Sequence, residues 1–303
     1  MQAWRPDLLS LRLFVAVCEE ASITRAAERE SLTPSAVSKR VSEIEEATGA
    51  VLLVRSARGV RPTAAGAALL HHARQITAAG DRLAIELGEY AQGVRGHVRL
   101  LANVSSISNR LPRDLGSFIA AHPRIRVDLQ ERVSALVADG VRDGAADLGI
   151  CQEAADLTGL SAQPYAVDRL ALVAHPAHPL ARRAAVAFDD ILDCEFVALS
   201  PESGTTRLLA GLAARQGRVL NHRLYVSTLD AACRVIAENL AVGILSKDAV
   251  ALLLAPLGLT TVALTDAWAE RRLVLCMREG EPLPAPARAF ADHLAAQRAA
   301  RER

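Results

Sequence analysis

Apolar residues recur at helical spacing near the start of the chain. Residues 7–20 carry an apolar side chain at every third or fourth position, which is the pattern of one buried helix face. Ser22 then suits the N-cap of a second helix, which runs on through residues 23–30. Thr33 suits a further N-cap, and Pro34 suits the first turn of the helix that follows it. The pattern predicts three short helices in succession.

The third of these helices is predicted over residues 35–49. Val37, Val41 and Ile44 share one face, and Gly49 supplies a C-terminal stop. Two short helices joined by a tight turn, the second of them capped, are the layout of a helix-turn-helix. The alternative is an ordinary helical domain with a solvated basic face.

The exposed face of the third helix carries short hydroxyls and a cation, which suits a helix whose first turns enter the major groove. These residues are Ser35, Ser38, Lys39 and Ser42. Residues 51–66 then predict a β-hairpin wing with Arg55, Arg58 and Arg61 near its tip. Residues 31–74 hold six basic groups against three acidic ones, although the whole chain is only +1. DNA phosphates sense such local charge, because salt screens distant charges.

A long helix without proline is predicted over residues 64–91. Its apolar and small residues follow each other at spacings of four and three over about three heptads, which indicates a dimerisation helix. The alternative is a single amphipathic helix folded against its own chain. The seam consists of Leu69, Ala73, Ile76, Gly80, Leu83, Leu87 and Tyr90.

From residue 93 onward, short strand patterns alternate with helical ones, which is typical of an α/β fold with parallel strands. Two such groups, roughly 94–165 and 166–266, predict two lobes, and the tail returns to the first lobe. One predicted helix covers residues 105–121. The predicted strands include residues 169–174 and 271–277.

Several predicted helices of this region begin with hydroxyl-rich segments, which lie after strand ends. In α/β sheets ligands bind at such points, where free amides and hydroxyls favour an anionic group such as a carboxylate. The alternative is that these serines and threonines only cap helices. The positions are Ser105, Ser106, Ser203, Thr205, Thr206 and Thr228.

Composition and motifs narrow the class of protein. The chain of 303 residues is 51% hydrophobic, which suffices for a large core, and its apolar runs are far shorter than the ~20 residues of a membrane helix. No signal-peptide pattern begins the sequence, so a cytoplasmic location is expected. The five scattered cysteines are expected to be reduced and to hold no metal. No catalytic motif is found, so we expect neither an enzyme nor a cofactor.

The N-terminal third resembles the LysR-type transcriptional regulators. The resemblance rests on an alanine pair in the second helix, the recognition segment TPSAVSKRVSEIEE, the wing RSARGVRPTAAG and the heptad helix, all in the family's order. It implies a winged helix-turn-helix over residues 1–63, a linker helix over 64–92 and a periplasmic-binding-protein-like effector domain over 93–303. The effector domain is expected to have two Rossmann-like subdomains, about 93–165 with 267–303, and about 166–266.

The resemblance also implies partners: double-stranded operator DNA, a small effector, and a homodimer or homotetramer. Its DNA contacts carry over to Thr33, Ser35, Ser38, Lys39, Arg40, Arg58 and Arg61. Its effector cleft carries over to Ser105, Ser106, the loop from Ser203 to Thr206, and Thr228. The sequence departs from the family pattern at Asn239, where glycine is common, and at Ser246, where proline is common.

Together these patterns predict a sequence-specific regulator whose activity is set by a small, anionic effector bound between two α/β lobes. The alternative is a small-molecule binding protein that does not recognise a DNA sequence.

Overall fold

The computed structural model describes residues 5–56, 59–92 and 96–301; the side chains of residue 82 and of residues 85–92 are not described. The chain divides into two compact units. The first contains the chain up to residue 96 and the short segment 142–146, and the second contains residues 97–141 and the chain from 147 onward. No helix in the described ranges is both long and apolar enough to span a membrane.

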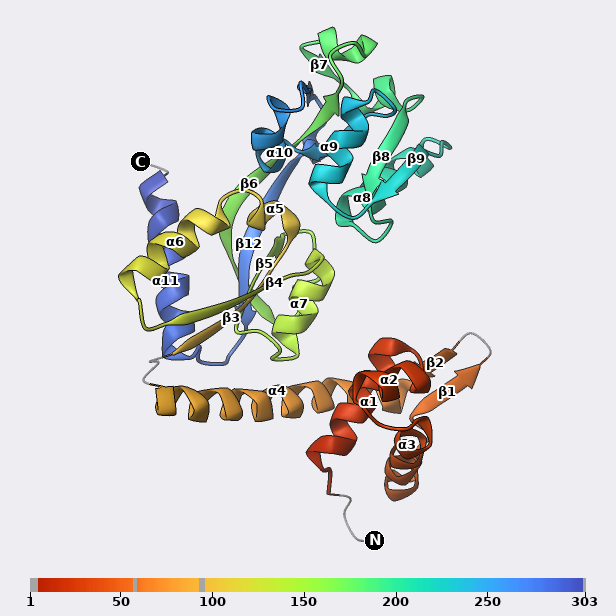
Figure 1. The fold of residues 1–303 in the computed structure, drawn as a ribbon, viewed down its shortest axis with the longest axis vertical. Helices are drawn as coiled ribbons and strands as arrows, with labels where there is room; N and C mark the ends of the chain where they lie inside the picture. The colour runs from red at the N-terminus through yellow and green to blue at the C-terminus, as the bar shows by residue number, and fades with distance from the viewer. Residues whose placement is uncertain (1–4, 57–58, 93–95, 302–303) are drawn as a thin grey trace. The chain divides into compact units, whose positions relative to one another are not determined.

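The first unit consists of three short helices, a hairpin and a long helix (Figure 1). The elements are α1 (Leu8–Glu20), α2 (Ile23–Arg29), α3 (Pro34–Thr48), β1 (Leu53–Ser56), β2 (Gly59–Pro62) and α4 (Ala64–Gln92). Strands β1 and β2 are antiparallel, as expected for a wing. The predicted winged helix-turn-helix and long helix are therefore confirmed.

Side-chain caps fix where these helices begin. The hydroxyls of Ser22 and Thr33 accept hydrogen bonds from backbone amides three residues further on, as predicted. Asp7 caps α1 in the same way, and its hydrogen bonds with Ser10, helped by nearby Arg40, lower the pKa of its carboxyl group. Gly49 ends α3 with a φ of +67°.

One apolar core joins the three helices to the hairpin. Phe14 and Val41 lie fully buried in it, and Leu52 brings in the start of the wing. A carboxylate oxygen of Glu45 accepts hydrogen bonds from the backbone amides of Leu52 and Leu53, over 2.7 and 3.1 Å. The wing is thus held against the helix that carries the predicted DNA-reading face.

The second unit is built on an eight-stranded mixed sheet with a separate pair of parallel strands (Figure 1). Its main path is β4-β3-β5-β12-β6-β11-β7, with β10 also paired to β6, and β8 pairs with β9. The strands are β3 (His97–Ala102), β4 (Arg126–Glu131), β5 (Leu148–Gln152), β6 (Leu160–Ala174), β7 (Ala185–Val186), β8 (Glu195–Leu199), β9 (Asn221–Val226), β10 (Gly243–Ser246), β11 (Thr260–Leu264) and β12 (Glu270–Arg278).

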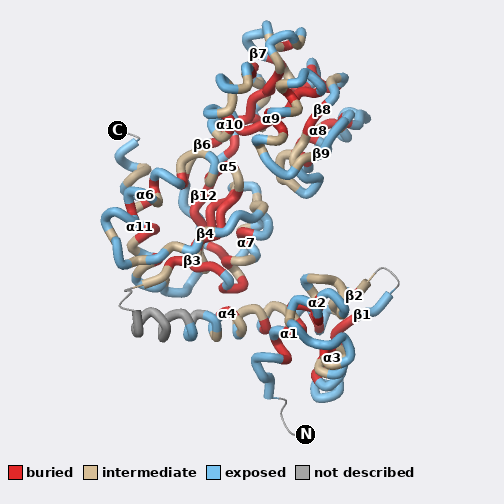
Figure 2. Tube along the Cα trace, viewed as in Figure 1, coloured by how far each residue is buried: buried red, intermediate tan, exposed pale blue. Residues whose placement is uncertain are grey.

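The helices of this unit cover the strands on both faces. They are α5 (Val104–Ile107), α6 (Leu111–Ala121), α7 (Ser134–Arg142), α8 (Gly204–Arg215), α9 (Leu229–Ala237), α10 (Lys247–Leu254) and α11 (Ala285–Arg301), with short 3₁₀ turns at Pro179–Arg182, Phe188–Ile191 and Ala267–Ala269. Figure 2 shows the buried residues concentrated along the strands.

The second unit has a first lobe, with β3 to β5 and helices α5 to α7 and α11, and a second lobe, with β7 to β11 and helices α8 to α10. One buried core lies in the first lobe, around Phe118 and Phe290, and two lie in the second, around Phe196 and Ile236. Strand β6 runs through both lobes, and β12 pairs with it antiparallel from the junction into the first lobe; we call these two the hinge strands.

Three expectations need correction. The helix expected over 105–121 is two helices, because Asn103 caps the short α5 and a new helix starts at Leu111. Strand β6 begins at Leu160 rather than near 169, and Pro164 lies opposite a register shift in its pairing with β12. Finally, β10, β6 and β12 pair antiparallel, so the sheet is mixed rather than parallel.

Candidate functional site

The first turns of α3 present a small polar surface. Thr33 and Ser35 are exposed, and their hydroxyl oxygens lie 3.1 Å apart. Lys39 is exposed too, and its ammonium lies 3.9 Å from Glu43, a distance at which an exposed pair contributes little. These side chains are therefore available to a partner that meets the start of α3.

Two arginines near this surface are already engaged. Arg55 of β1 donates from both terminal nitrogens to the Ser38 hydroxyl, over 3.3 Å each, so it bridges the wing and α3. Arg40, for which a DNA contact is predicted, donates to the Ser10 hydroxyl over 3.2 Å and to Asp7 over 3.4 Å. Its guanidinium is thus turned toward α1.

The wing contributes one described cation beyond Arg55. Arg61 of β2 is exposed, and its strand partner across the hairpin is Val54. Arg58, the other expected contact at the tip, lies outside the described residues. The hairpin is anchored at its base, where Gly66 of α4 approaches the Leu52 carbonyl so closely that a Cβ atom would stand 2.0 Å from the oxygen.

The expected dimerisation seam on α4 is divided between two environments. Ala73 is fully buried and Leu69 is partly buried against the core of the first unit. Gly80 faces Leu8 of the same chain, whereas Ile76 and Leu83 are 41% and 59% exposed. The side chains of Leu87 and Tyr90 lie outside the described part. Of the five described seam residues, Leu69, Ala73 and Gly80 pack within the first unit, and Ile76 and Leu83 stay open.

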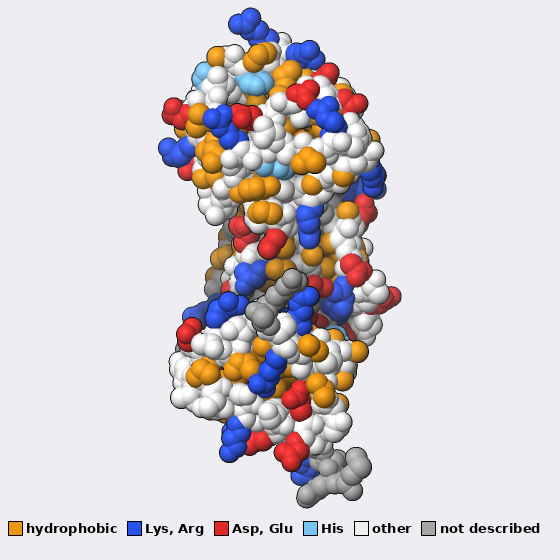
Figure 3. Space-filling view, turned by 90° about the vertical axis from the view of Figure 1, so that its right-hand side faces the viewer, with side chains coloured by type: hydrophobic (Ala, Val, Ile, Leu, Met, Phe, Trp, Pro, Cys, Tyr) orange, Lys and Arg blue, Asp and Glu red, His pale blue; other side chains and the backbone are white. Residues whose placement is uncertain are grey.

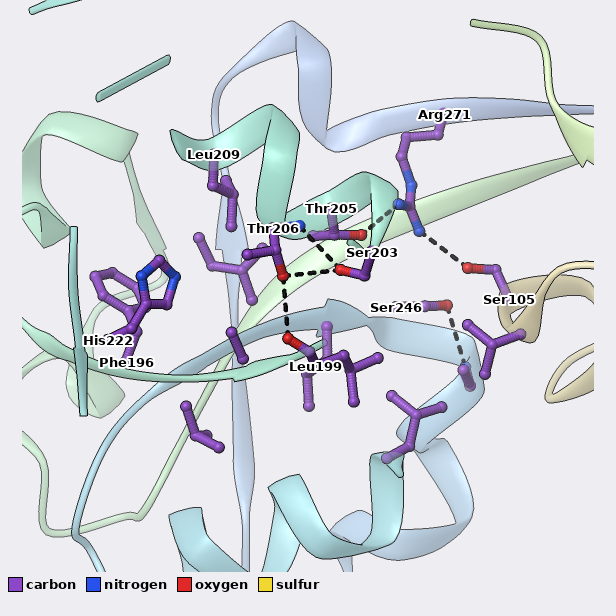
Figure 4. Close-up of a pocket in the computed structure, with 17 residues that line it drawn as sticks. Ser105, Phe196, Leu199, Ser203, Thr205, Thr206, Leu209, His222, Ser246 and Arg271 are labelled. Atoms are coloured by element: carbon purple, nitrogen blue, oxygen red, sulfur yellow. Dashed lines mark hydrogen bonds between the residues drawn. The ribbon is translucent and has the colours of Figure 1, made fainter. Parts of the chain in front are cut away.

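Arg271 lines one end of a cleft between the two lobes (Figure 4). Its Nη1 donates to Thr205 Oγ1 over 2.8 Å, and its Nη2 donates to Ser105 Oγ over 3.1 Å. Ser105 belongs to α5 of the first lobe, and Thr205 belongs to the first turn of α8 in the second lobe. One guanidinium on a hinge strand therefore contacts both walls of the cleft.

A buried carboxylate balances this guanidinium. Asp168 of β6 is directly opposite Arg271 in the strand register and accepts a hydrogen bond from its Nη2. The two residues are 0% and 9% exposed, so both groups have lost most of their water. Ser246 donates to the other Asp168 oxygen over 2.5 Å and also caps α10. The serine that departs from the family pattern thus supports the carboxylate.

Arg271 retains one unused donor. Within the described part of the chain, no acceptor lies within hydrogen-bonding distance of its buried Nε. An unpaired buried N–H costs roughly 1–3 kcal/mol. A ligand acceptor placed in the cleft could remove that cost.

The other expected effector residues divide into two groups. Ser203 and Thr206 line the cleft, where their hydroxyls lie 2.8 Å apart and Ser203 caps α8. Ser106 is buried, and its hydroxyl donates to Asn103 within its own turn. Thr228 is exposed and caps α9, outside the cleft lining. The structure brings Ser105, Ser203, Thr205 and Thr206 together and leaves Ser106 and Thr228 outside the cleft lining.

The cleft is narrow and has two chemically distinct ends. Its free volume is about 40 Å³, which is room for about three water molecules. The polar end holds Arg271 and the hydroxyls, and the other end is lined by apolar side chains and by His222, whose pKa is lowered by burial. Figure 4 shows Phe196 and His222 at this second end. A larger ligand requires the lobes or Arg271 to move.

Asn239, the second departure from the family pattern, ends α9 with a φ of +54°. Asparagine tolerates this left-handed conformation better than most residues. The backbone turn that glycine commonly provides in the family is therefore kept.

Comparison with known protein families gives two matches. Residues 8–67 match the family described as bacterial regulatory helix-turn-helix protein, lysR family. Residues 91–299 match the LysR substrate binding domain. The two matches fall on the winged helix-turn-helix and on the two-lobed unit that contains the cleft.

Individual relatives agree with these matches. An uncharacterised HTH-type transcriptional regulator of Mycobacterium bovis is 30% identical over 245 residues, 78% of each chain. The crystal structure of CbnR, a LysR family transcriptional regulator also solved with its target DNA, covers 96% of this chain and 99% of its own, with a TM-score of 0.65 and 21% identity. The regulatory domain of Synechocystis PCC6803 CcmR, solved with 2-PG, covers 67% and 97%, with a TM-score of 0.62 and 25% identity.

Proposed function

Because this chain belongs to the LysR family of transcriptional regulators and carries the family's effector-binding domain, we propose that it reads a specific operator and that a small anionic effector sets its activity. The observation that carries the effector proposal is the buried guanidinium of Arg271, which meets both lobes and keeps one unused N–H. An anion or other acceptor in the cleft accepts a hydrogen bond from this group. Because Arg271 also contacts Thr205 and Ser105, such a ligand is coupled to both lobes.

Anion binding at this place has a second source of support. Helix α8 starts at the cleft, and the partial positive charge of a helix N-terminus favours a negative group. The apolar end of the cleft favours a carbon body beside the charge. We propose a small organic acid or phosphate ester, held by Arg271, Ser105 and Thr205, with Ser203 and Thr206 shaping the wall. Ser106 and Thr228 are assigned to supporting the local turns.

DNA reading is assigned to the start of α3 and to the wing. Thr33, Ser35, Ser38 and Lys39 offer hydroxyls and one cation, and Arg61 offers a cation to phosphates. Arg58 stays a proposed wing contact. Arg40 is assigned a structural role, because its guanidinium bonds to α1. A regulator of this kind acts on chromosomal DNA, so we propose a cytoplasmic location and no catalytic role.

The test is fluorescence anisotropy of the purified protein on its own upstream intergenic DNA and on scrambled DNA, across a salt series. Tight, salt-sensitive binding that prefers the upstream DNA supports the regulator. Equal, weak binding to both favours the alternative, a binding protein that does not recognise a DNA sequence. Small carboxylates and phosphate esters, each with an uncharged analogue, are then titrated into the protein–DNA complex. A response to neutral analogues alone contradicts the anionic effector.

Replacing Arg61 by alanine is expected to weaken binding to upstream and scrambled DNA alike. If Arg61 neutralises one phosphate, the slope of log K against log salt becomes shallower by about 0.9. The same anisotropy series measures both quantities. Arg124→Ala, which removes an exposed arginine from the effector-binding domain, is the control. An unchanged slope for Arg61→Ala excludes a phosphate contact.

The exposed seam residues of α4, Ile76 and Leu83, support a homodimer. Ile76 and Leu83 lie seven residues apart on α4, and Leu8 and Leu9 of α1 are 52% and 44% exposed nearby. A second copy that covers these four side chains removes them from water. We propose that the dimer forms here; the tetramer implied by the family resemblance stays a prediction.

Leu83→Glu is expected to weaken the dimer by about 2 kcal/mol or more, because it loses a buried leucine and places a charge in the interface. Sedimentation equilibrium measures the dissociation constant, which is expected to rise at least about 30-fold. Leu252→Glu, at a leucine of α10 that is 89% exposed, is the matched control and is expected to leave the dimer intact. Equal effects of the two changes contradict the proposed interface.

A further inference from the structure

A second cavity lies against the hinge strands, separate from the cleft. Its volume is about 670 Å³, within the range of small-molecule sites. Successive side chains of a strand point to opposite faces, so Arg169 and Arg272 lie on the face opposite Asp168 and Arg271. Arg169 and Arg272 of this opposite face line the cavity, which shares none of its lining residues with the cleft.

The lining of this cavity is strongly basic. It has six cations against two carboxylates, Glu153 and Asp248. Elsewhere the surface is mixed, and Figure 3 shows basic and acidic side chains interspersed over the face that it displays. The six cations are Arg110, Arg169, Lys247, Arg272, Arg298 and Arg301.

Only some of these cations are neutralised. Arg169 pairs with Glu270 over 3.1 Å, and Arg301 pairs with the buried Asp114 over 2.5 Å. Among the ion pairs formed by the described residues, none includes Arg110, Lys247 or Arg272. Three cations therefore share a cavity without a carboxylate partner, and their mutual repulsion is relieved by an anion.

The unpaired cations come from three different parts of the second unit. Arg110 immediately precedes α6 of the first lobe, Lys247 begins α10 of the second lobe, and Arg272 belongs to hinge strand β12. Asn109 donates to Asp248 over 3.0 Å beside them, so the two lobes meet at this cavity. An anion seated here contacts both lobes and the strand between them.

The floor of the cavity contains a buried, hydrogen-bonded tyrosine and several apolar side chains. Tyr165 lines it and donates its hydroxyl to Asp114 over 2.7 Å, in a site where the tyrosine is only 3% exposed. Burial and the neighbouring Asp114 carboxylate raise the pKa of Tyr165, so the hydroxyl stays protonated at neutral pH. Pro164, Ala166 and Val167 add apolar surface. The floor therefore suits the carbon body of a ligand.

We propose that this cavity is a second binding site, for an organic anion that carries at least two negative charges, such as a polycarboxylate or a phosphate ester. The site goes beyond the proposed cleft effector and does not depend on it, because no residue is shared. The three cations without a carboxylate partner, Arg110, Lys247 and Arg272, favour an anion with more than one negative charge, and the apolar floor distinguishes an organic anion from a bare inorganic ion.

Isothermal titration calorimetry on the full chain tests the site, with citrate and glycerol 3-phosphate as anions and glycerol as the uncharged control. We expect saturable binding of at least one anion and none of glycerol. The Lys247→Gln/Arg272→Gln double variant is expected to raise the dissociation constant at least about tenfold, because both charge contacts are lost. Arg215→Gln, at an exposed arginine of α8 outside the cavity, is expected to change it less than twofold.

A cleft variant separates this site from the proposed effector site. Thr205→Val removes a cleft hydroxyl and is expected to leave anion binding in the cavity within twofold of the wild type. Loss of binding in Thr205→Val, with retention in the double variant, assigns the anion to the cleft and overturns the proposal. Absence of saturable binding by the wild type also overturns the proposal. So does a loss of anion affinity in Arg215→Gln that equals the loss in the double variant. Matching melting temperatures show that the variants are folded.

Discussion

Arg271→Met is expected to destabilise the second unit by about 3–5 kcal/mol, because it leaves the Asp168 carboxylate buried and without its counter-ion. Ser246 still donates to that carboxylate, but one hydroxyl does not balance a charge. Denaturant unfolding, followed through Trp268, measures the change, since this indole packs edge-to-face on Phe188 of the second lobe. A loss of this size identifies Arg271 as the counter-ion that the buried Asp168 needs.

The Arg271→Met/Asp168→Asn double variant provides the matched test. Removing both charges takes away the unpaired carboxylate, so most of the lost stability is expected to return. A double-mutant cycle with Asp168→Asn is expected to give a coupling energy of about 2 kcal/mol or more. If the double variant instead loses the sum of the two single changes, the residues do not act as a pair.

Ser35→Glu is expected to weaken operator binding about 100-fold while leaving the fold intact. Ser35 is exposed in the first turn of α3, where a carboxylate stabilises a helix by about 0.3–1 kcal/mol. The same carboxylate meets DNA phosphates as a like charge, which costs several kcal/mol. Anisotropy on upstream DNA measures the affinity, and thermal unfolding shows whether the head remains stable.

The control for this change is Ala135→Glu. It adds the same charge to the second residue of another exposed helix, α7 of the second unit, and is expected to leave operator affinity within about twofold. Equal losses in the two variants point to a general effect of net charge. No loss in Ser35→Glu places the DNA-reading surface elsewhere.

Local chemistry explains why the first unit could be predicted from the sequence. Thr33, Pro34 and Gly49 act through short-range hydrogen bonds and backbone preferences, and the structure uses Thr33 and Gly49 as expected. The expectation of one helix after Asn103 overlooks Pro112, which lies in the first turn of α6 and is typical of a helix start rather than of a helix interior.

The cleft could be only partly predicted. Its hydroxyls follow strands and open helices, a pattern that the sequence contains, and Ser105 and Thr205 do come together there. Arg271 was missed, since its role depends on a strand register that joins it to Asp168, 103 residues earlier. The sequence does contain an indication of this pair: Asp168 and Arg271 each lie next to an apolar strand segment. Because a charged residue is rarely buried without a partner, two such residues of opposite sign are candidates for a buried ion pair.

The α4 seam shows a different limit. Spacings of four and three identified an apolar stripe, but periodicity does not say which molecule covers it. Ala73 and Gly80 are small enough for α1 of the same chain to pack closely, and the larger Ile76 and Leu83 stay open. Between residues 73 and 83, the small side chains are therefore the ones covered by the same chain, and the large ones are left exposed.

The hinge strands also define an order of assembly. Arg169 and Glu270 are register partners, so the whole second lobe is an insertion whose two ends lie one strand spacing apart. Its cores use residues between Leu170 and Ala269, a continuous stretch, whereas the first lobe needs β12 and α11 from the end of the chain. Contacts that are close in sequence form with less loop entropy. The inserted lobe can therefore fold on its own stretch of chain before the first lobe is complete. A chain that ends before Glu270 keeps the inserted lobe, but it lacks β12 and α11, so its first lobe is incomplete and its cleft has no Arg271 guanidinium.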